Sequence, residues 1–191
     1  YRMGPEAPFP AAVDDALAAY KALLETRAAA NIIIAGDSAG GGLTLAVAMK
    51  IRDAGLAQPA GRVGLSPWDD LNQIGSSYDT KADADPMVSR DGLNWFAAHY
   101  LGTTGDADDP YASPAYGDFS GLPPLLIQVG ADEVLLSDSI AVADRAGSAH
   151  VAVTLEVWPK MIHVFQSFYP FLQDSRDAIA RIGAGSRDQL S

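Results

Sequence analysis

Residues 31–42 read Asn-Ile-Ile-Ile-Ala-Gly-Asp-Ser-Ala-Gly-Gly-Gly, an apolar run followed by the pattern G-x-S-x-G and two further glycines. The run over 31–35 predicts a buried strand, and the small and apolar residues over 39–52 predict a helix that packs against the sheet. A serine in the tight turn between such a strand and helix has an exposed hydroxyl, which is the geometry of a nucleophile elbow. We therefore predict that Ser38 is a nucleophile.

The helix that follows this turn gives it a second predicted role. Because the first N–H groups of a helix have no intrahelical acceptor, the N–H of Ala39 can point at a developing oxyanion. Gly36 and Gly40 should relieve crowding around Ser38, since neither has a Cβ. The alternatives are a glycine-rich connection with no catalytic role and a phosphate loop. The phosphate loop is disfavoured because the chain lacks G-x-x-x-x-G-K-[ST] and Lys50 lies far along the helix.

The composition is that of one soluble globular domain, with 191 residues of which 48% are hydrophobic and 19% charged. Thirteen basic and 24 acidic residues give a net charge of −11, so we expect no nucleic-acid or anionic-membrane partner. The absence of cysteine excludes disulfides, a cysteine nucleophile and thiolate metal sites. No apolar stretch approaches the roughly 18 to 20 residues of a membrane span. We expect a small neutral molecule as the partner and a cytoplasmic location.

Hydrophobic periodicity predicts further helices and strands along the chain. The predicted strands are 62–66, 124–130 and 151–157, and the predicted helices are one from Pro10 to Leu24, one over 92–101 capped by Ser89, one over 138–146 between Ser137 and Gly147, one that begins near Ile162, and one over 175–182.

The character of the predicted strands indicates the fold class. Strands 62–66 and 124–130 are nearly continuous apolar runs, which is typical of parallel strands covered on both faces. Alternation over 151–157 instead predicts a half-exposed edge strand. We predict an α/β fold with a mostly parallel sheet and helices on both faces. The excursion over 67–123 is too long for a simple crossover and should form one wall of the binding crevice.

A nucleophilic serine needs a base, which in turn needs an acid to orient it. Of the three histidines, His99 falls within a predicted helix and His150 just before the edge strand, so packing or surface roles are expected for both. His163 follows the end of a strand, which places it at the same sheet edge as Ser38. We predict that His163 is the base, with a core histidine as the alternative.

The acid should follow the end of a strand that lies between the nucleophile and the base in chain order. Strand 124–130 meets this condition and is followed by Asp132 and Glu133. Both carboxylates qualify by position, and a solvated acidic loop is the alternative interpretation.

Together these motifs resemble the bacterial hormone-sensitive-lipase-like (family IV) carboxylesterases of the α/β-hydrolase fold. Residues 1–12, Tyr-Arg-Met-Gly-Pro-Glu-Ala-Pro-Phe-Pro-Ala-Ala, are similar to the family's Y-R-L-A-P-E-x-P-F-P-A-A block, and residues 36–41 match its G-D-S-A-G-G. Leu-Ser-Pro-Trp at 65–68, Ser-Pro at 113–114 and Gly-Leu-Pro-Pro at 121–124 match as well. The resemblance covers almost the whole chain.

The resemblance implies a role for each predicted site residue. Ser38 resembles the family nucleophile and His163 its base. The family acid is followed two residues later by leucine, a pattern that residues 133–135, Glu-Val-Leu, fit. The resemblance therefore implies Glu133, rather than Asp132, as the acid.

The implied activity is that of a serine carboxylesterase that cleaves short-acyl esters through an acyl-enzyme, without a metal or an organic cofactor. A peptidase or amidase on the same fold is an alternative. A non-catalytic hormone-binding relative is another, although plant gibberellin receptors, which resemble this family, have lost the catalytic histidine that His163 resembles. An inactive fragment is the third. The resemblance also favours a homodimer formed through the edge strand 151–157.

The resemblance further implies that residues 1–191 are the C-terminal portion of a single catalytic domain. In the family, a His-Gly-Gly-Gly loop and the first strands of the sheet lie upstream of the Y-R-L-A-P-E block. We expect about 90 to 120 additional N-terminal residues, within the size of a single domain. Without them, Ile32–Ile34 should line an open, uncharged sheet edge, and residues 1–191 alone should be poorly soluble and nearly inactive.

Overall fold

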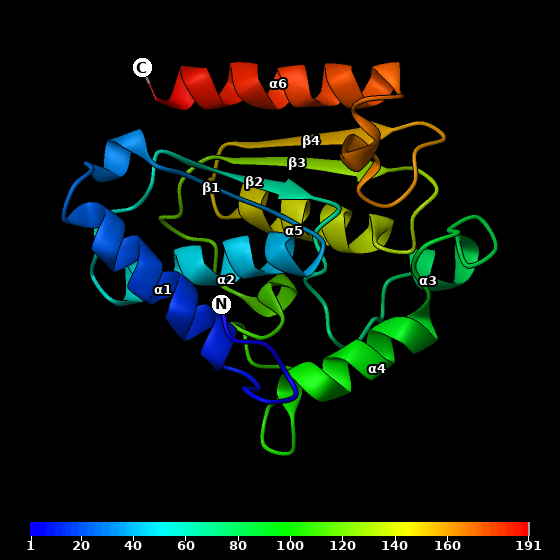
Figure 1. Ribbon diagram of the computed structural model, residues 1–191, viewed down its shortest axis with the longest axis horizontal. Helices are drawn as coiled ribbons and strands as arrows, with labels where there is room; N and C mark the ends of the chain where they lie inside the picture. Colours follow the sequence, from blue (N-terminus) through cyan, green and yellow to red (C-terminus); the bar gives the residue numbers. More distant parts are fainter. Residues whose placement is uncertain (191) are drawn as a thin grey trace.

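Four parallel strands form one sheet within residues 1–190, the part of the chain that the computed structural model describes (Figure 1). Their spatial order follows the sequence: β1 (Ile33–Asp37), β2 (Gly61–Leu65), β3 (Leu125–Gly130) and β4 (Val153–Trp158). The pairing register aligns the carboxyl ends of all four strands at one edge of the sheet. The predicted parallel sheet is therefore confirmed.

Helices cover both faces of this sheet, as predicted (Figure 1). On one face lie α2 (Ala39–Asp53) and α5 (Leu136–Ser148), with α1 (Ala11–Leu24) packed against α2. On the other face lies α6 (Gln173–Gln189). The shorter elements are α3 (Ser77–Thr80), α4 (Arg90–Leu101) and three 3₁₀ turns, η1 (Ala29–Asn31), η2 (Pro114–Tyr116) and η3 (Phe165–Phe168).

The two faces of the sheet are held by different interactions. Between the sheet and helices α2 and α5 lies the largest apolar cluster, which includes Leu45, Met49, Ile127 and Val142. Helix α6, in contrast, buries only two small residues, Ser175 and Ala178. It is attached by polar contacts: Gln128 Nε2 donates to the Ala178 carbonyl at 3.0 Å, and Ser175 Oγ donates to the Phe165 carbonyl at 2.6 Å. Arg181 on α6 also pairs with Glu156 on β4 at 3.2 Å.

Part of the predicted excursion packs against the loop after β3. Its apolar side chains, among them Trp68, Tyr78 and Leu93, form a second cluster with Val134 and Leu135. Helix α4 begins in this excursion, and its predicted cap is confirmed, because Ser89 Oγ accepts a hydrogen bond from the Gly92 N–H at 3.2 Å.

Two predicted helix ends are wrong. Ser137 is not the N-cap of α5, since Leu135 occupies that position. Its Oγ accepts instead from the N–H of Ser77, 60 residues away, at 2.9 Å. Gly147 does not end the helix, which continues to Ser148. Contacts with the excursion and the sheet thus override the local capping pattern.

Several strand and helix boundaries also differ from the prediction. The strand predicted at 31–35 starts two residues later, because η1 forms first, and the one predicted at 151–157 starts at Val153. The helix expected near Ile162 is only the 3₁₀ turn η3, and α6 is longer than 175–182 at both ends.

Strands β1 and β4 are the edges of the sheet within residues 1–190. The edge position predicted for β4 is confirmed. Ile32 does not lie on the β1 edge; it is buried with Tyr20, Val47 and Ile51 between η1 and helices α1 and α2. The expectation that further residues precede the chain stays a prediction. None of the helices in residues 1–190 combines the length and the apolar character that a bilayer span requires.

Candidate active site

Ser38 lies at the turn between β1 and α2 in a backbone conformation that non-glycine residues rarely adopt, with φ 52° and ψ −121°. Three backbone hydrogen bonds hold it there. Its N–H donates to the Leu65 carbonyl at 2.9 Å, and its carbonyl accepts from Gly42 at 3.1 Å and Trp68 at 2.9 Å. A strained conformation persists only where its surroundings over-determine it, as they do here.

At Gly36 a side chain would not fit, whereas at Gly40 it would. A Cβ on Gly36 would collide with the Gly40 carbonyl oxygen and lie 2.9 Å from Thr44 Oγ1, as the elbow pattern predicts. A Cβ on Gly40 would meet no described atom within 4 Å. The prediction that Gly40 relieves crowding is therefore wrong for the described residues.

Two further glycines allow the segment after β2 to approach the turn. A Cβ on Gly41 would lie 2.8 Å from Pro67 Cα, and a Cβ on Gly42 would collide with the Trp68 carbonyl oxygen. Ala39, the first residue of α2, has one of the helix N–H groups that lack an intrahelical acceptor. The Gly-Gly pair thus allows Pro67 and Trp68 to lie close against the start of α2.

His163 and Glu133 form a buried hydrogen-bonded pair. The distance from His163 Nδ1 to Glu133 Oε2 is 2.9 Å, and the two residues are 6% and 0% exposed. Glu133 follows β3 and His163 follows β4, so both lie at the sheet edge where Ser38 follows β1. Within residues 1–190, the Ser38 hydroxyl makes no hydrogen bond, to His163 or to any other group.

Glu133 has a donor for each carboxylate oxygen. Oε1 accepts from the Gly130 N–H at 2.5 Å and from Ser66 Oγ at 2.7 Å, and Oε2 faces His163. A buried carboxylate is costly unless it is paired and hydrogen-bonded in this way. Sequence reasoning missed Ser66, although it lies in the Leu-Ser-Pro-Trp motif directly after β2.

Asp132, the other acid that qualified by position, is placed differently. Its side chain is 37% exposed and lies 3.6 Å from Lys81 Nζ. Its backbone N–H donates to the Met161 carbonyl at 3.1 Å. The structure thus brings Glu133, and not Asp132, to His163.

The other two histidines lie away from this pair. His99 Nδ1 is 2.7 Å from the Trp95 carbonyl oxygen, and its ring stacks on Trp95 at 4.0 Å between centroids. His150 follows α5 and is exposed. No group of three or more acidic or histidine side chains within residues 1–190 is arranged to hold a metal ion.

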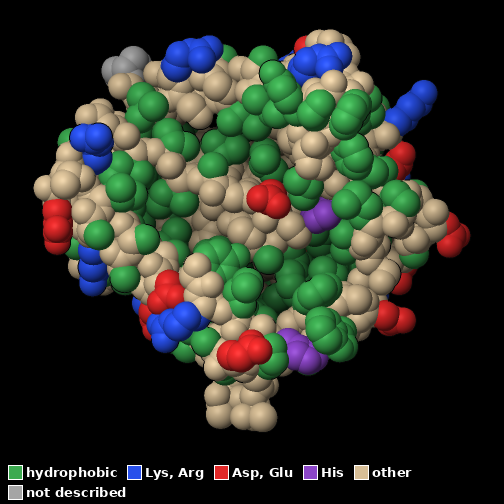
Figure 2. Space-filling view, viewed as in Figure 1, with side chains coloured by type: hydrophobic (Ala, Val, Ile, Leu, Met, Phe, Trp, Pro, Cys, Tyr) green, Lys and Arg blue, Asp and Glu red, His purple; other side chains and the backbone are tan. Residues whose placement is uncertain are grey.

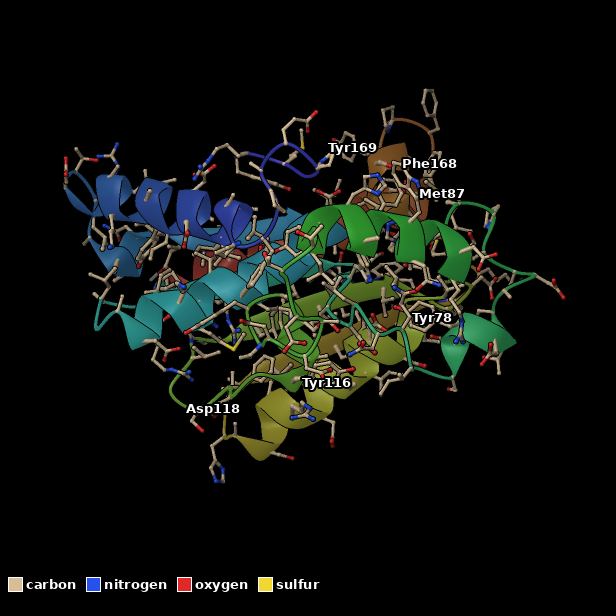
Figure 3. The ribbon with its side chains drawn as sticks, turned by 90° about the horizontal axis from the view of Figure 1, so that it is seen from below. Tyr78, Met87, Tyr116, Asp118, Phe168 and Tyr169 are labelled. Carbon is tan, nitrogen blue, oxygen red and sulfur yellow. The ribbon has the colours of Figure 1, made fainter. Side chains whose placement is uncertain are left out.

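Asp69 and Asp70, which follow β2, form a cluster of buried carboxyl groups with Asp138 that the sequence did not predict. Asp69 is fully buried, and neither of its carboxyl oxygens has a hydrogen-bond partner in the described part of the chain. Burial, followed by the charges of Asp138 and Asp70, holds the pKa of Asp69 well above its usual range. Burial likewise raises the pKa of Asp138 to about 8. Tyr78 donates to Asp138 at 2.8 Å and Tyr116 to Asp70 at 2.7 Å. Both tyrosines are labelled in Figure 3.

A cavity of about 340 Å³ opens beside the start of α2. Its lining is mainly apolar and includes Ala39, Leu43, Trp68, Trp95 and Phe96. The excursion contributes many of these residues, while Ser38, Glu133 and His163 are not among them. Figure 2 shows one face of the molecule hollowed near its centre and bordered by hydrophobic side chains.

Comparisons with known proteins are consistent with this architecture. The family model described as alpha/beta hydrolase fold matches residues 1–167. The acetyl-hydrolase of Streptomyces hygroscopicus is 47% identical over 185 residues, which are 96% of this chain and 62% of that protein. An esterase of Acinetobacter venetianus is 34% identical over 183 residues, or 95% of this chain and 60% of that protein. The chain spans about 60% of the length of these curated relatives.

Solved structures are similar over the whole chain. The crystal structure of EstE5 soaked with ethyl alcohol is 50% identical, has a TM-score of 0.97, and is covered over 64% of its own length. An esterase from the bacterial hormone-sensitive lipase family is 46% identical, with a TM-score of 0.97 and the same 64% coverage. These findings confirm the predicted fold and the resemblance to hormone-sensitive-lipase-like esterases. The chain belongs to the alpha/beta hydrolase fold family.

Proposed function

We propose that the protein is a serine carboxylesterase that cleaves short-acyl carboxylic esters through an acyl-enzyme. The observation that carries the proposal is the buried His163–Glu133 hydrogen bond at the sheet edge where the strained turn presents Ser38. Relatives named acetyl-hydrolase and esterase support the reaction class. The apolar cavity beside Ala39 supports an apolar acyl or alkyl group as part of the substrate.

In this proposal, Ser38 Oγ attacks the carbonyl carbon of the ester while its proton passes to His163. Because Nδ1 of His163 faces Glu133, the proton is taken by Nε2. Glu133 then stabilises the imidazolium and fixes the tautomer. The N–H of Ala39 donates to the oxyanion that forms at the former carbonyl oxygen.

Collapse of this tetrahedral intermediate completes the first half of the reaction. The bond to the alkoxide breaks, and His163 returns the proton to the leaving alcohol. A water molecule then attacks the acyl-serine with the same proton transfers. The carboxylic acid is released and Ser38 regains its proton.

The first test is covalent labelling by a fluorophosphonate, with the protein expressed at the full length that its gene encodes. We expect stoichiometric modification at Ser38, identified by mass spectrometry, and none in Ser38→Ala. Ser120→Ala is the matched control, because Ser120 is exposed and lies outside the proposed site. Stoichiometric labelling at another serine, or none at all, would contradict the proposal and favour a non-catalytic relative.

A second test separates an esterase from a peptidase or amidase on the same fold. Esters and anilides of one short acyl group are compared under the same conditions. We expect ester turnover to exceed anilide turnover by orders of magnitude. A preference for the anilide would favour the amidase alternative.

We also propose, as separate points, a homodimer through β4 and a cytoplasmic location. The support for the dimer is that β4 is a sheet edge within residues 1–190 and that its one charged residue is Glu156.

A further inference from the structure

Ser66, the residue after β2, contacts the acid of the pair and the backbone next to its base. It is fully buried, and its backbone lies in the left-handed region with φ 46°. Its hydroxyl donates to Glu133 Oε1 at 2.7 Å and accepts from the N–H of Val164, the residue after His163, at 3.1 Å. One hydroxyl therefore connects the carboxyl group of Glu133 to the backbone of the loop that carries His163.

The direction of these two hydrogen bonds follows from their partners. The N–H of Val164 can only donate, so the Ser66 oxygen must accept there. The single O–H proton of Ser66 is then free for the carboxylate, which in its ionised form can only accept. Ser66 therefore supplies Glu133 Oε1 with a donor and leaves Oε2 to His163.

Val164 makes this contact in a conformation that is unfavourable for its residue type. Its φ is 47° and its ψ is 44°, in the left-handed region, where a β-branched residue is a rare outlier. Such strain requires stabilising contacts. The hydrogen bond from Val164 to Ser66 is one of them, and it fixes the backbone immediately after His163.

We propose that Ser66 is a positioning residue for the reaction: it holds Glu133 and the His163 loop in the relative orientation that proton transfer requires. It does not touch the substrate or the reacting atoms. The inference rests on the proposed esterase function, because it assigns Ser66 a role that acts through Glu133.

The proposal predicts a specific kinetic signature for Ser66→Ala. Removing the hydroxyl leaves Glu133 Oε1 with one donor and the Val164 N–H without its partner. Without this contact, Glu133 is held less well against the imidazolium that forms in the transition state, and a misplacement of about 1 Å can cost up to about 100-fold in rate, so a loss of about 10- to 100-fold is expected. We expect this loss in kcat and in the rate of fluorophosphonate labelling. KM should stay within about threefold, because no contact to the substrate is removed.

Ser113→Ala is the matched control for general loss of stability. Ser113 is as deeply buried as Ser66, and its Oγ likewise accepts a backbone N–H, that of Leu71 at 2.9 Å. It contacts neither Glu133 nor His163. We expect Ser113→Ala to lower Tm about as much as Ser66→Ala while kcat stays near that of the parent.

A double-mutant cycle with Glu133→Gln tests whether Ser66 acts through the acid. We expect Ser66→Ala to lower kcat by no more than about twofold in the Glu133→Gln background. An equal loss in both backgrounds would overturn the proposal, since Ser66 would then act independently of Glu133. A parent-like kcat for Ser66→Ala, with Glu133→Gln strongly impaired, would overturn it too.

The same variants separate failure of this inference from failure of the proposed function. If Glu133→Gln keeps full activity, the assignment of the acid is wrong and the positioning role falls with it. If Ser66→Ala does not fold, Ser66→Cys takes its place, because a thiol is of similar size but donates weakly. A reduced kcat in Ser66→Cys would support the role, and a parent-like kcat would overturn it.

Discussion

At the scale of single residues, Ser38 combines an unfavourable backbone with a hydroxyl that contributes little to the fold. With φ at 52°, a serine at this position is strained, whereas glycine adopts the conformation freely. Function and stability should therefore oppose each other at this residue.

Two substitutions of Ser38 test that opposition. Ser38→Ala should abolish the burst of acyl-enzyme formation while the protein remains folded, because the hydroxyl has no hydrogen-bond partner within residues 1–190. Ser38→Gly should also be inactive, and it should raise the free energy of unfolding by about 1 kcal/mol. Stopped-flow ester kinetics and urea denaturation measure the two effects. Substantial ester turnover by Ser38→Ala would remove Ser38 from the mechanism.

The acid assignment predicts a large difference between two neighbouring residues. Glu133→Gln should favour the wrong tautomer of His163 and lower kcat by about 10⁴-fold. Asp132→Asn should leave kcat nearly unchanged, since Asp132 is partly exposed and its charged contact is Lys81. Steady-state kinetics of both variants decide the point. The opposite ranking would assign the acid role to Asp132.

The buried carboxyl groups of Asp69 and Asp138 predict how stability depends on pH. Their folded-state pKa values lie above the unfolded value of about 3.9, so above about pH 4 the folded state binds more protons than the unfolded state. The free energy of unfolding should therefore fall as pH rises from about 4 through 8, by up to about 1.4 kcal/mol per pH unit for one proton. Asp70 and Tyr78 face the same cluster.

Asp69→Asn should remove much of this pH dependence. The variant carries no charge to desolvate, so its stability at pH 8 should exceed that of the parent, and its profile between pH 5 and pH 8 should be flatter. Asp83→Asn is the control, because Asp83 is exposed. Chemical denaturation at several pH values gives both profiles. If the stability of the parent changed between pH 5 and pH 8 in the same way as that of Asp69→Asn, the assignment would be wrong.

At the scale of secondary-structure elements, sequence patterns succeeded where the decisive contacts are local. The β1–α2 turn could be predicted because strand, turn and helix signals follow one another within residues 31–52. The cap of α4 could be predicted for the same reason, since Ser89 and Gly92 are three residues apart. The predicted Ser137 cap is wrong because the Ser137 hydroxyl accepts instead from a backbone N–H 60 residues away.

The candidate site shows the same division. Ser38, His163 and the pair of possible acids could be found at strand ends. The preference for Glu133 came from the family resemblance rather than from position. Ser66 and Asp69 could not be found, because their roles depend on contacts 67 and 69 positions along the chain, with Glu133 and Asp138. Periodicity carries no information on such pairings.

The free edge of β4 supports a prediction at the same scale. The carbonyls of Ala152 and Trp158 accept hydrogen bonds from the β3 side, so in a parallel pair the N–H groups of Val153 and Val157 face outward. An outward N–H is available to a second copy of the chain. Val153→Pro removes one such donor without breaking the pairing to β3 and should convert the proposed homodimer to a monomer.

Light scattering at tens of micromolar protein measures this change. Val153→Thr is the matched control, since it keeps the outward N–H and the β-branched shape. A parent protein that is monomeric at this concentration would contradict the homodimer. A dimer that survives Val153→Pro would move the interface to another surface.

At the scale of the whole molecule, each strand contributes one residue to the candidate site. Ser38 follows β1, Ser66 follows β2, Glu133 follows β3 and His163 follows β4. These residues span 126 positions of the sequence, and the pairing of β1 to β4 in one parallel sheet brings their four carboxyl ends together. The proposed activity should therefore be lost in the same transition that melts the sheet.

The polar attachment of α6 has a consequence for how the molecule opens. A helix that buries only two small side chains should come away from the rest at a lower free energy than the apolar body formed by α2, α5 and the sheet. In hydrogen–deuterium exchange, the amides of α6 should then exchange through local opening, while those of α2 should wait for global unfolding. Helix α6 is expected to detach first and reversibly, so that transient solvation of one sheet face, at Gln128 and its neighbours, is part of the native ensemble.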